Sequence, residues 1–210
     1  MVPIEDNNGQ ISGSILVIND LSTNIAIEQV LRQLEHMAMH DPVTDMPNRR
    51  YVEMNIHGKL AEVQRYGWLF GVLFVMIDDF SKLVENYGND AGKNILKVVA
   101  YAMRNVLRPF DILGRWRDEY FVVVVANVAE EQLNIVANRM KNLIASSNIS
   151  IGANTMNVTT SIGGTIARED DRLDSMLRRA SDQMLQAKNK GGNCALTSPK
   201  PEMGEKYQIK

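Results

Sequence analysis

The chain has 210 residues, of which 45% are hydrophobic and 23% are charged, and its formal net charge at pH 7 is −2. This composition supplies the core of one full domain plus a fragment, since domains average about 150 residues. A charge so close to zero excludes the basic surface with which proteins bind nucleic acids or anionic membranes.

Cysteine usage and hydropathy indicate the compartment. Cys194 is the single cysteine, and His36, His40 and His57 are scattered, so we expect neither a disulfide nor a zinc site. The longest strongly apolar run, residues 68–77, is about half of what spans a bilayer, and the N-terminus lacks a signal-peptide pattern. The sequence predicts a cytoplasmic chain with no membrane insertion and no nucleic-acid partner.

Residues 1–20 are too few to close a core, and the sequence pattern changes from strand to helix at residue 21. Residues 11–18 are rich in β-forming residues and follow a turn at residues 6–9. Residues 21–40 have a helical period, in which apolar residues recur at spacings of three and four: Ile27, Val30, Leu34 and Met37. Two interpretations stay open, a short coiled-coil seam that makes a homodimer or an amphipathic helix packed on its own domain.

The following elements alternate between helices and strands. We expect helices from residue 49 to Gly67 and over residues 90–107, 130–144 and 173–188. We expect strands over residues 69–77, 112–116, 120–126 and 156–167, with a short strand near Ala195 and a polar tail over 198–210. This order predicts an α+β fold, a ferredoxin-like palm whose mostly antiparallel central sheet is flanked by helices.

Two acidic pairs lie at strand boundaries. Asp78 and Asp79 end one strand, and Asp118 and Glu119 occupy the turn between two others. In a palm fold these carboxylates converge on one rim, where they suit Mg²⁺ and a nucleoside triphosphate. The alternative is that the turns are acidic because Asp and Glu are well solvated there.

Residues 41–50, Asp-Pro-Val-Thr-Asp-Met-Pro-Asn-Arg-Arg, resemble the N-terminal motif of GGDEF domains, the diguanylate cyclases that condense two GTP into cyclic di-GMP. The resemblance covers residues 41–197 and continues through residues 77–80, 87–89, 108–121, 161–163 and 187–191. Residues 1–20 look like the last strands of a PAS sensor, and residues 21–40 then form the linking signalling helix. The resemblance therefore implies other signalling domains in the same protein.

The signature of this family is degenerate here. Its five positions hold Arg117, Asp118, Glu119, Tyr120 and Phe121. In the family, paired glycines let GTP phosphates approach the backbone, and Arg117 and Asp118 obstruct that approach. Glu119 keeps a metal-binding carboxylate, with Asp78 as a second candidate metal ligand, but a phenol at Tyr120 cannot replace the catalytic acid. A shift of one residue would restore two acids and rotate the core face of the next strand outward.

At other positions, too, residues that bind substrate or metal in the family are replaced in this sequence. Met76 stands where active members carry a metal-binding Asp, and a thioether is a poor Mg²⁺ ligand. Val84 and Lys93 replace the Asn and Asp that bond guanine. Ser81 and Gly192 replace phosphate-binding Lys and Arg residues, which leaves Lys188 as the matching phosphate-binding cation.

One family site is retained. Arg108 and Asp111 match the RxxD inhibitory motif, and Arg139 matches a second product-binding arginine on the next helix. The resemblance implies that Arg108, Asp111 and Arg139 bind cyclic di-GMP, with the arginine fork on guanine or phosphate. The alternative is a surface ion pair between Arg108 and Asp111, of small energetic value.

These departures predict a degenerate, inactive diguanylate cyclase-like signalling domain that binds cyclic di-GMP and needs no cofactor. Two alternatives remain. The first is an active cyclase that uses Mg²⁺ to make cyclic di-GMP, and the second is a structural dimerisation module.

Overall fold

The computed structural model describes residues 2–5, 9–15, 21–151 and 154–198, and the chain divides into two compact units, residues 1–38 and 39–210. In the first unit, strands β1 (Val2–Glu5) and β2 (Ile11–Ile15) pair antiparallel, and helix α1 covers Leu21–Met39. The rest of the predicted β-run, residues 16–18, and most of the predicted tail lie outside the described residues.

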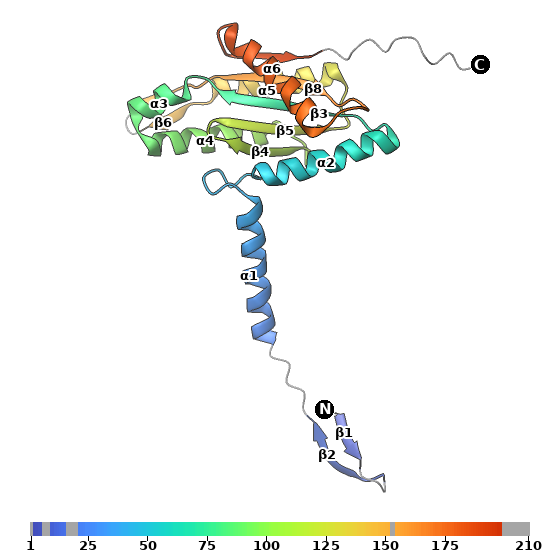
Figure 1. Cartoon of the computed structure of the whole chain (residues 1–210). Helices are drawn as coiled ribbons and strands as arrows, with labels where there is room; N and C mark the ends of the chain where they lie inside the picture. The colour runs from blue at the N-terminus through green and yellow to red at the C-terminus, as the bar shows by residue number, and fades with distance from the viewer. Residues whose placement is uncertain (1, 6–8, 16–20, 152–153, 199–210) are drawn as a thin grey trace, which may run out of the picture. The chain divides into compact units, whose positions relative to one another are not determined.

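The second unit is built on a five-stranded sheet (Figure 1) in the order β4-β5-β3-β8-β9. The strands are β3 (Phe70–Ile77), β4 (Ile112–Arg117), β5 (Tyr120–Ala126), β8 (Thr160–Ile166) and β9 (Cys194–Thr197). All neighbours pair antiparallel except β8 and β9, which are parallel. The predicted α+β palm with a mostly antiparallel central sheet is confirmed.

Helices cover both faces of this sheet. One apolar cluster joins α4 (Asn89–Arg104) and α5 (Glu130–Ser146) to one face, and a second joins α2 (Arg49–Tyr66) and α6 (Leu173–Asn189) to the other. Successive side chains of a strand point to opposite faces, so β3 contributes alternately to the two clusters. Val75 and Ile77 face α4 and α5, whereas Phe74 and Met76 face α2 and α6.

Two regions differ from the sequence prediction. Helix α3 (Phe80–Tyr87) precedes α4, where the sequence predicted no element before residue 90. The strand predicted over residues 156–167 is wrong at its start: β7 (Asn154–Met156) pairs with β6 (Ile149–Ile151) in a separate hairpin, and β8 begins at Thr160. The β-rich run was continuous in sequence, and nothing local marked the point where it changes partner.

Helix α6 lies directly on β8. A Cβ atom at Gly163 would collide with the backbone of Ala180 and Met184 in α6. Backbone atoms cannot move aside as the end of a side chain can, so this close approach requires glycine. Among the described residues, no helix is long and apolar enough to cross a membrane.

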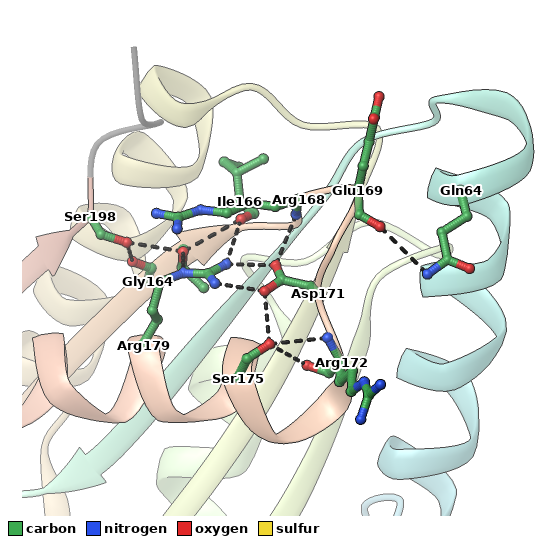
Figure 2. Close-up of polar contacts among 11 residues, drawn as sticks. Gln64, Gly164, Ile166, Arg168, Glu169, Asp171, Arg172, Ser175, Arg179 and Ser198 are labelled. Carbon is green, nitrogen blue, oxygen red and sulfur yellow. Dashed lines mark hydrogen bonds and ion pairs between the residues drawn. The ribbon is translucent and has the colours of Figure 1, made fainter. Parts of the chain in front are cut away.

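A polar network fixes the start of α6 to the end of β8, as Figure 2 shows. Arg179 of α6 donates from Nη1 and Nη2 to the two carboxylate oxygens of buried Asp171, at 2.7 Å each, and from Nε to Thr165 at 3.0 Å. The Arg168 amide and the Ser175 hydroxyl also donate to Asp171. Burial raises the pKa of Asp171, but these donors outweigh it, so that the pKa lies below its usual value.

Candidate functional site

Residues 117–121, which match the family signature, form the hairpin between β4 and β5. Arg117 pairs with Tyr120, and the turn between them holds Asp118 and Glu119. Asp118 has a φ of 38°, in the left-handed region that favours glycine. Asp is among the side chains best tolerated there, so the turn persists without the family's glycine. Phe121 is fully buried in the core beside α4 and α5.

The metal-binding edge of the family is occupied by apolar groups. Met76 of β3 lies directly opposite Tyr120 of β5, so both side chains point to the same face. Met76 is 1% exposed, and the Phe74 ring contacts the rings of Tyr120 and Trp116 edge-on, with centroids 6.0 and 6.1 Å away. The guanidinium of Arg117 lies 5.4 Å from the Tyr120 ring centre.

These side chains do not fit Mg²⁺, which takes oxygen ligands. Burial and the neighbouring charge of Glu119 raise the pKa of Tyr120, so its phenol stays protonated at neutral pH. Within the part of the chain that the structure describes, no three His, Cys, Asp or Glu side chains are arranged to hold a metal.

The two candidate metal ligands, Asp78 and Glu119, lie in different environments. Asp78 accepts hydrogen bonds from Thr159 and Ser161, both at 2.7 Å, and from the Asn193 amide at 2.9 Å. It thereby joins the end of β3 to β8 and to the loop before β9. Glu119 is half-buried, and its backbone oxygen accepts the Ile77 amide at 3.3 Å. Metal binding by either carboxylate stays a prediction.

Val84 and Lys93, which match the family's guanine-binding positions, line a mostly apolar cavity of about 350 Å³. Val84 packs against Gly92, where a Cβ atom would lie 2.8 Å from a Val84 methyl group. Lys93 is engaged by Asp90 at 3.0 Å. The cavity is lined by Val43, Phe80, Val84, Asn89, Gly92, Lys93, Leu96 and Arg115. Val84 and Lys93 offer no hydrogen-bond acceptor to the N1–H and amino group of a guanine, whereas Asn89 in the same lining carries one.

Oppositely charged side chains lie around Lys188, the predicted phosphate-binding residue. Asp79 accepts a hydrogen bond from Lys82 at 2.7 Å. That bond and the Lys82 charge, with a smaller contribution from Lys188, lower the pKa of Asp79. Lys188 is exposed near the end of α6. Lys188 is therefore accessible to a phosphate group, and Asp79, just after the end of β3, is its acidic neighbour.

An ion pair that the sequence analysis missed connects the N-terminal motif to the signature hairpin. Arg115 donates from Nη1 to both carboxylate oxygens of Asp41, at 3.1 and 3.2 Å. Its Nε and Nη2 donate to the backbone oxygen of Asp118, at 3.1 and 2.8 Å. Thr44 donates its amide and hydroxyl to Asp41. The only signal in the sequence was an arginine two residues before the signature.

The retained RxxD motif forms a closed turn before β4. Arg108 and Arg139 are exposed, as the sequence implied. Asp111, in contrast, is buried, with 5% of its surface exposed, so its carboxylate does not share the exposed edge of Arg108, and its contact with a ligand stays a prediction. Its carboxylate accepts the backbone amides of Arg108 at 2.9 Å and of Ala126 at 3.1 Å. Asp111 therefore holds the turn closed, and the contact that joins it to Arg108 is a backbone hydrogen bond.

Two curated relatives cover most of this chain. The response regulator PleD of Caulobacter vibrioides is 29% identical over 163 residues, which are 76% of this chain and 36% of PleD. The cyclic di-GMP phosphodiesterase NbdA of Pseudomonas aeruginosa is 26% identical over 183 residues, 83% of this chain and 23% of NbdA. The chain therefore spans well under half the length of these relatives.

Solved structures share the fold. The diguanylate cyclase SiaD, in complex with its activator SiaC from Pseudomonas aeruginosa, is 25% identical with a TM-score of 0.76, over 85% of this chain and 70% of that one. The coiled coil and GGDEF domain of DgcB from Caulobacter crescentus, in complex with c-di-GMP, has a TM-score of 0.80 at 18% identity. The match covers 85% of this chain and 95% of the DgcB chain. The family model described as diguanylate cyclase, GGDEF domain, matches residues 38–194. The chain belongs to the GGDEF-domain family.

Proposed function

We propose that this chain is a catalytically silent GGDEF domain that acts as a cyclic di-GMP receptor module in a longer signalling protein. The observation that carries the loss of catalysis is the pair of Met76 and Tyr120. These residues face each other across β3 and β5 at the family's metal-binding edge, and Met76 is buried. Neither offers a carboxylate.

The other departures support the same proposal. Val84 removes a guanine acceptor, and Arg117 and Asp118 add bulk and a negative charge where phosphates approach. Catalytic groups act as a unit, so the loss of several leaves little activity from those that remain. Asp78 is engaged by Thr159 and Ser161, and this supports a structural role for that carboxylate.

Calorimetry with GTP and Mg²⁺ tests the loss of the substrate site. We expect no saturable heat at millimolar GTP, because base, phosphate and metal contacts are all reduced. A GGDEF domain with an intact signature is the positive control. Saturable binding that Lys188→Ala or Glu119→Ala weakens would show that the substrate site survives.

The receptor role is supported by Arg108 and Arg139, two exposed guanidinium groups outside the signature hairpin. A guanidinium fork matches the O6 and N7 acceptors of guanine and the oxygens of phosphate. Asp111 contributes by holding the Arg108 turn, with both oxygens bonded to backbone amides.

Titration of the domain with cyclic di-GMP tests this role. Charge-assisted hydrogen bonds contribute about 1.5–3 kcal/mol each, so Arg108→Ala is expected to weaken binding by about tenfold to a few hundredfold. Arg178 is another exposed arginine, on α6; Arg178→Ala is the matched control and should bind as the wild type does. Absence of heat with the wild type, or equal affinity of Arg108→Ala, would refute the receptor role.

A second candidate function, dimerisation, is favoured by one observation on α1. The residues of its apolar stripe are each more than half exposed: Ile27, Val30, Leu34 and Met37. Their spacing of three and four fits a two-stranded coiled coil. We propose that α1 is the signalling helix of a homodimer, that residues 1–20 end a PAS sensor, and that the domain works in the cytoplasm. Neither role needs a cofactor.

A further inference from the structure

The turn between α4 and β4 presents its two middle residues to solvent. Asp111 closes the turn from inside, because its carboxylate accepts the Arg108 and Ala126 amides while its own amide donates to the Arg108 oxygen at 3.1 Å. Pro109 fixes one backbone angle of the turn. The backbone between Arg108 and Asp111 is therefore held in place, and Arg108 and Phe110 are both exposed on it.

Phe110 is the most exposed large apolar side chain among the described residues, at 78%. It belongs to neither apolar cluster of the second unit. A single exposed apolar residue is ordinary on a protein surface. Phe110 differs because it lies two residues from the exposed Arg108, on a turn whose hydrogen bonds do not involve the phenyl ring. The turn would close as well with a polar residue at this position.

We propose that Phe110 is a stacking platform for a purine base of bound cyclic di-GMP, a proposal that rests on the receptor function above. A purine offers two kinds of surface, a polar edge and a flat π-face. The Arg108 fork bonds the O6 and N7 edge of guanine, and the Phe110 ring covers the face of a base beside it. Base–aromatic stacking is tolerant of sequence but requires a ring, so an aliphatic side chain at position 110 should not serve.

Calorimetry with cyclic di-GMP on four proteins tests the proposal. Relative to the wild type, Phe110→Ala is expected to weaken binding by about five- to 150-fold, which is the usual range for one stacked base. Phe110→Leu should bind as poorly as Phe110→Ala, although it is apolar. Tyr101→Ala removes another exposed aromatic ring, 67% exposed on α4, and should leave the affinity unchanged.

A spectroscopic measurement separates stacking from a structural effect. In Phe110→Trp the new indole should retain affinity, and its fluorescence should be quenched on adding cyclic di-GMP. Equal affinity of wild type and Phe110→Ala, or of Phe110→Leu and wild type, would overturn the stacking role and leave the receptor function standing. Absence of heat with the wild type would instead refute the receptor function and the stacking role with it.

Discussion

Replacing Arg115 by methionine is expected to destabilise the second unit by about 2–4 kcal/mol. Removing one partner of a fully buried ion pair costs about 3–5 kcal/mol, because the other charge is left uncompensated. The Arg115 and Asp41 side chains are 14% and 17% exposed, so solvent screens part of that cost. Arg115→Met also leaves the Asp118 oxygen without its two side-chain donors.

The effect should depend on pH in a defined direction. Partial burial raises the pKa of Asp41, but hydrogen bonds from Thr44 and Arg115 outweigh it and place the pKa below its usual value. A carboxyl with a lowered pKa contributes stability above its unfolded pKa of about 3.9 and loses it as the pH falls through the folded value. The difference in the free energy of unfolding between wild type and Arg115→Met should therefore be largest at neutral pH and should shrink below about pH 4.

Urea unfolding followed by tryptophan fluorescence measures this difference. The matched control is Arg49→Met, because Arg49 also forms an ion pair, with Glu53 at 2.6 Å, but keeps 57% exposure. We expect the control to cost about 1 kcal/mol or less. Arg115→Met could lower the free energy of unfolding no more than Arg49→Met does, or by the same amount in acid as at neutral pH. Either result would show that the ion pair does not hold the hairpin to the N-terminal motif.

Three further changes have expected outcomes. Gly163→Ala should lower the melting temperature sharply or prevent folding, because the added methyl group meets the α6 backbone. The control is Gly164→Ala, whose added methyl group meets only side chains, and equal melting temperatures of the two variants would contradict the prediction. Asp171→Asn should cost about 2–4 kcal/mol in urea unfolding at pH 7, and less in acid because the pKa of Asp171 is lowered; an effect that grows in acid would contradict it. Leu34→Asp, in a protein that contains the whole sensor, should halve the mass measured by light scattering, and an unchanged dimer mass would show that the stripe has another partner.

Local patterns predicted most elements of the sheet unit. Strand β5 was predicted over the residues it occupies, and β3 within one residue, because both are continuous apolar runs bounded by polar turns. Helix α3 was missed because eight residues give barely two turns and only Gly88 separates it from α4. The β6–β7 hairpin was missed because its strands have three residues each.

Side-chain partners at the site could not be predicted in the same way. Arg115 and Asp41 are 74 residues apart, so their contact depends on the completed sheet. The RxxD spacing identified Asp111 as part of a turn, but spacing does not tell whether a carboxylate faces ligand or backbone amides. Substitutions such as Met76 and Tyr120 were visible in the sequence. That Met76 and Tyr120 lie opposite each other on β3 and β5 could be known only from the pairing register of the two strands.

An assay of cyclic di-GMP synthesis is the most direct test of the proposed loss of catalysis. The protein is incubated with GTP and Mg²⁺, and the product is separated by chromatography and identified by mass. We expect no cyclic di-GMP above a no-protein control, because Met76 and Tyr120 provide no metal-binding carboxylate and Val84 provides no guanine acceptor. Turnover above that control, abolished by Glu119→Ala, would contradict the proposed function.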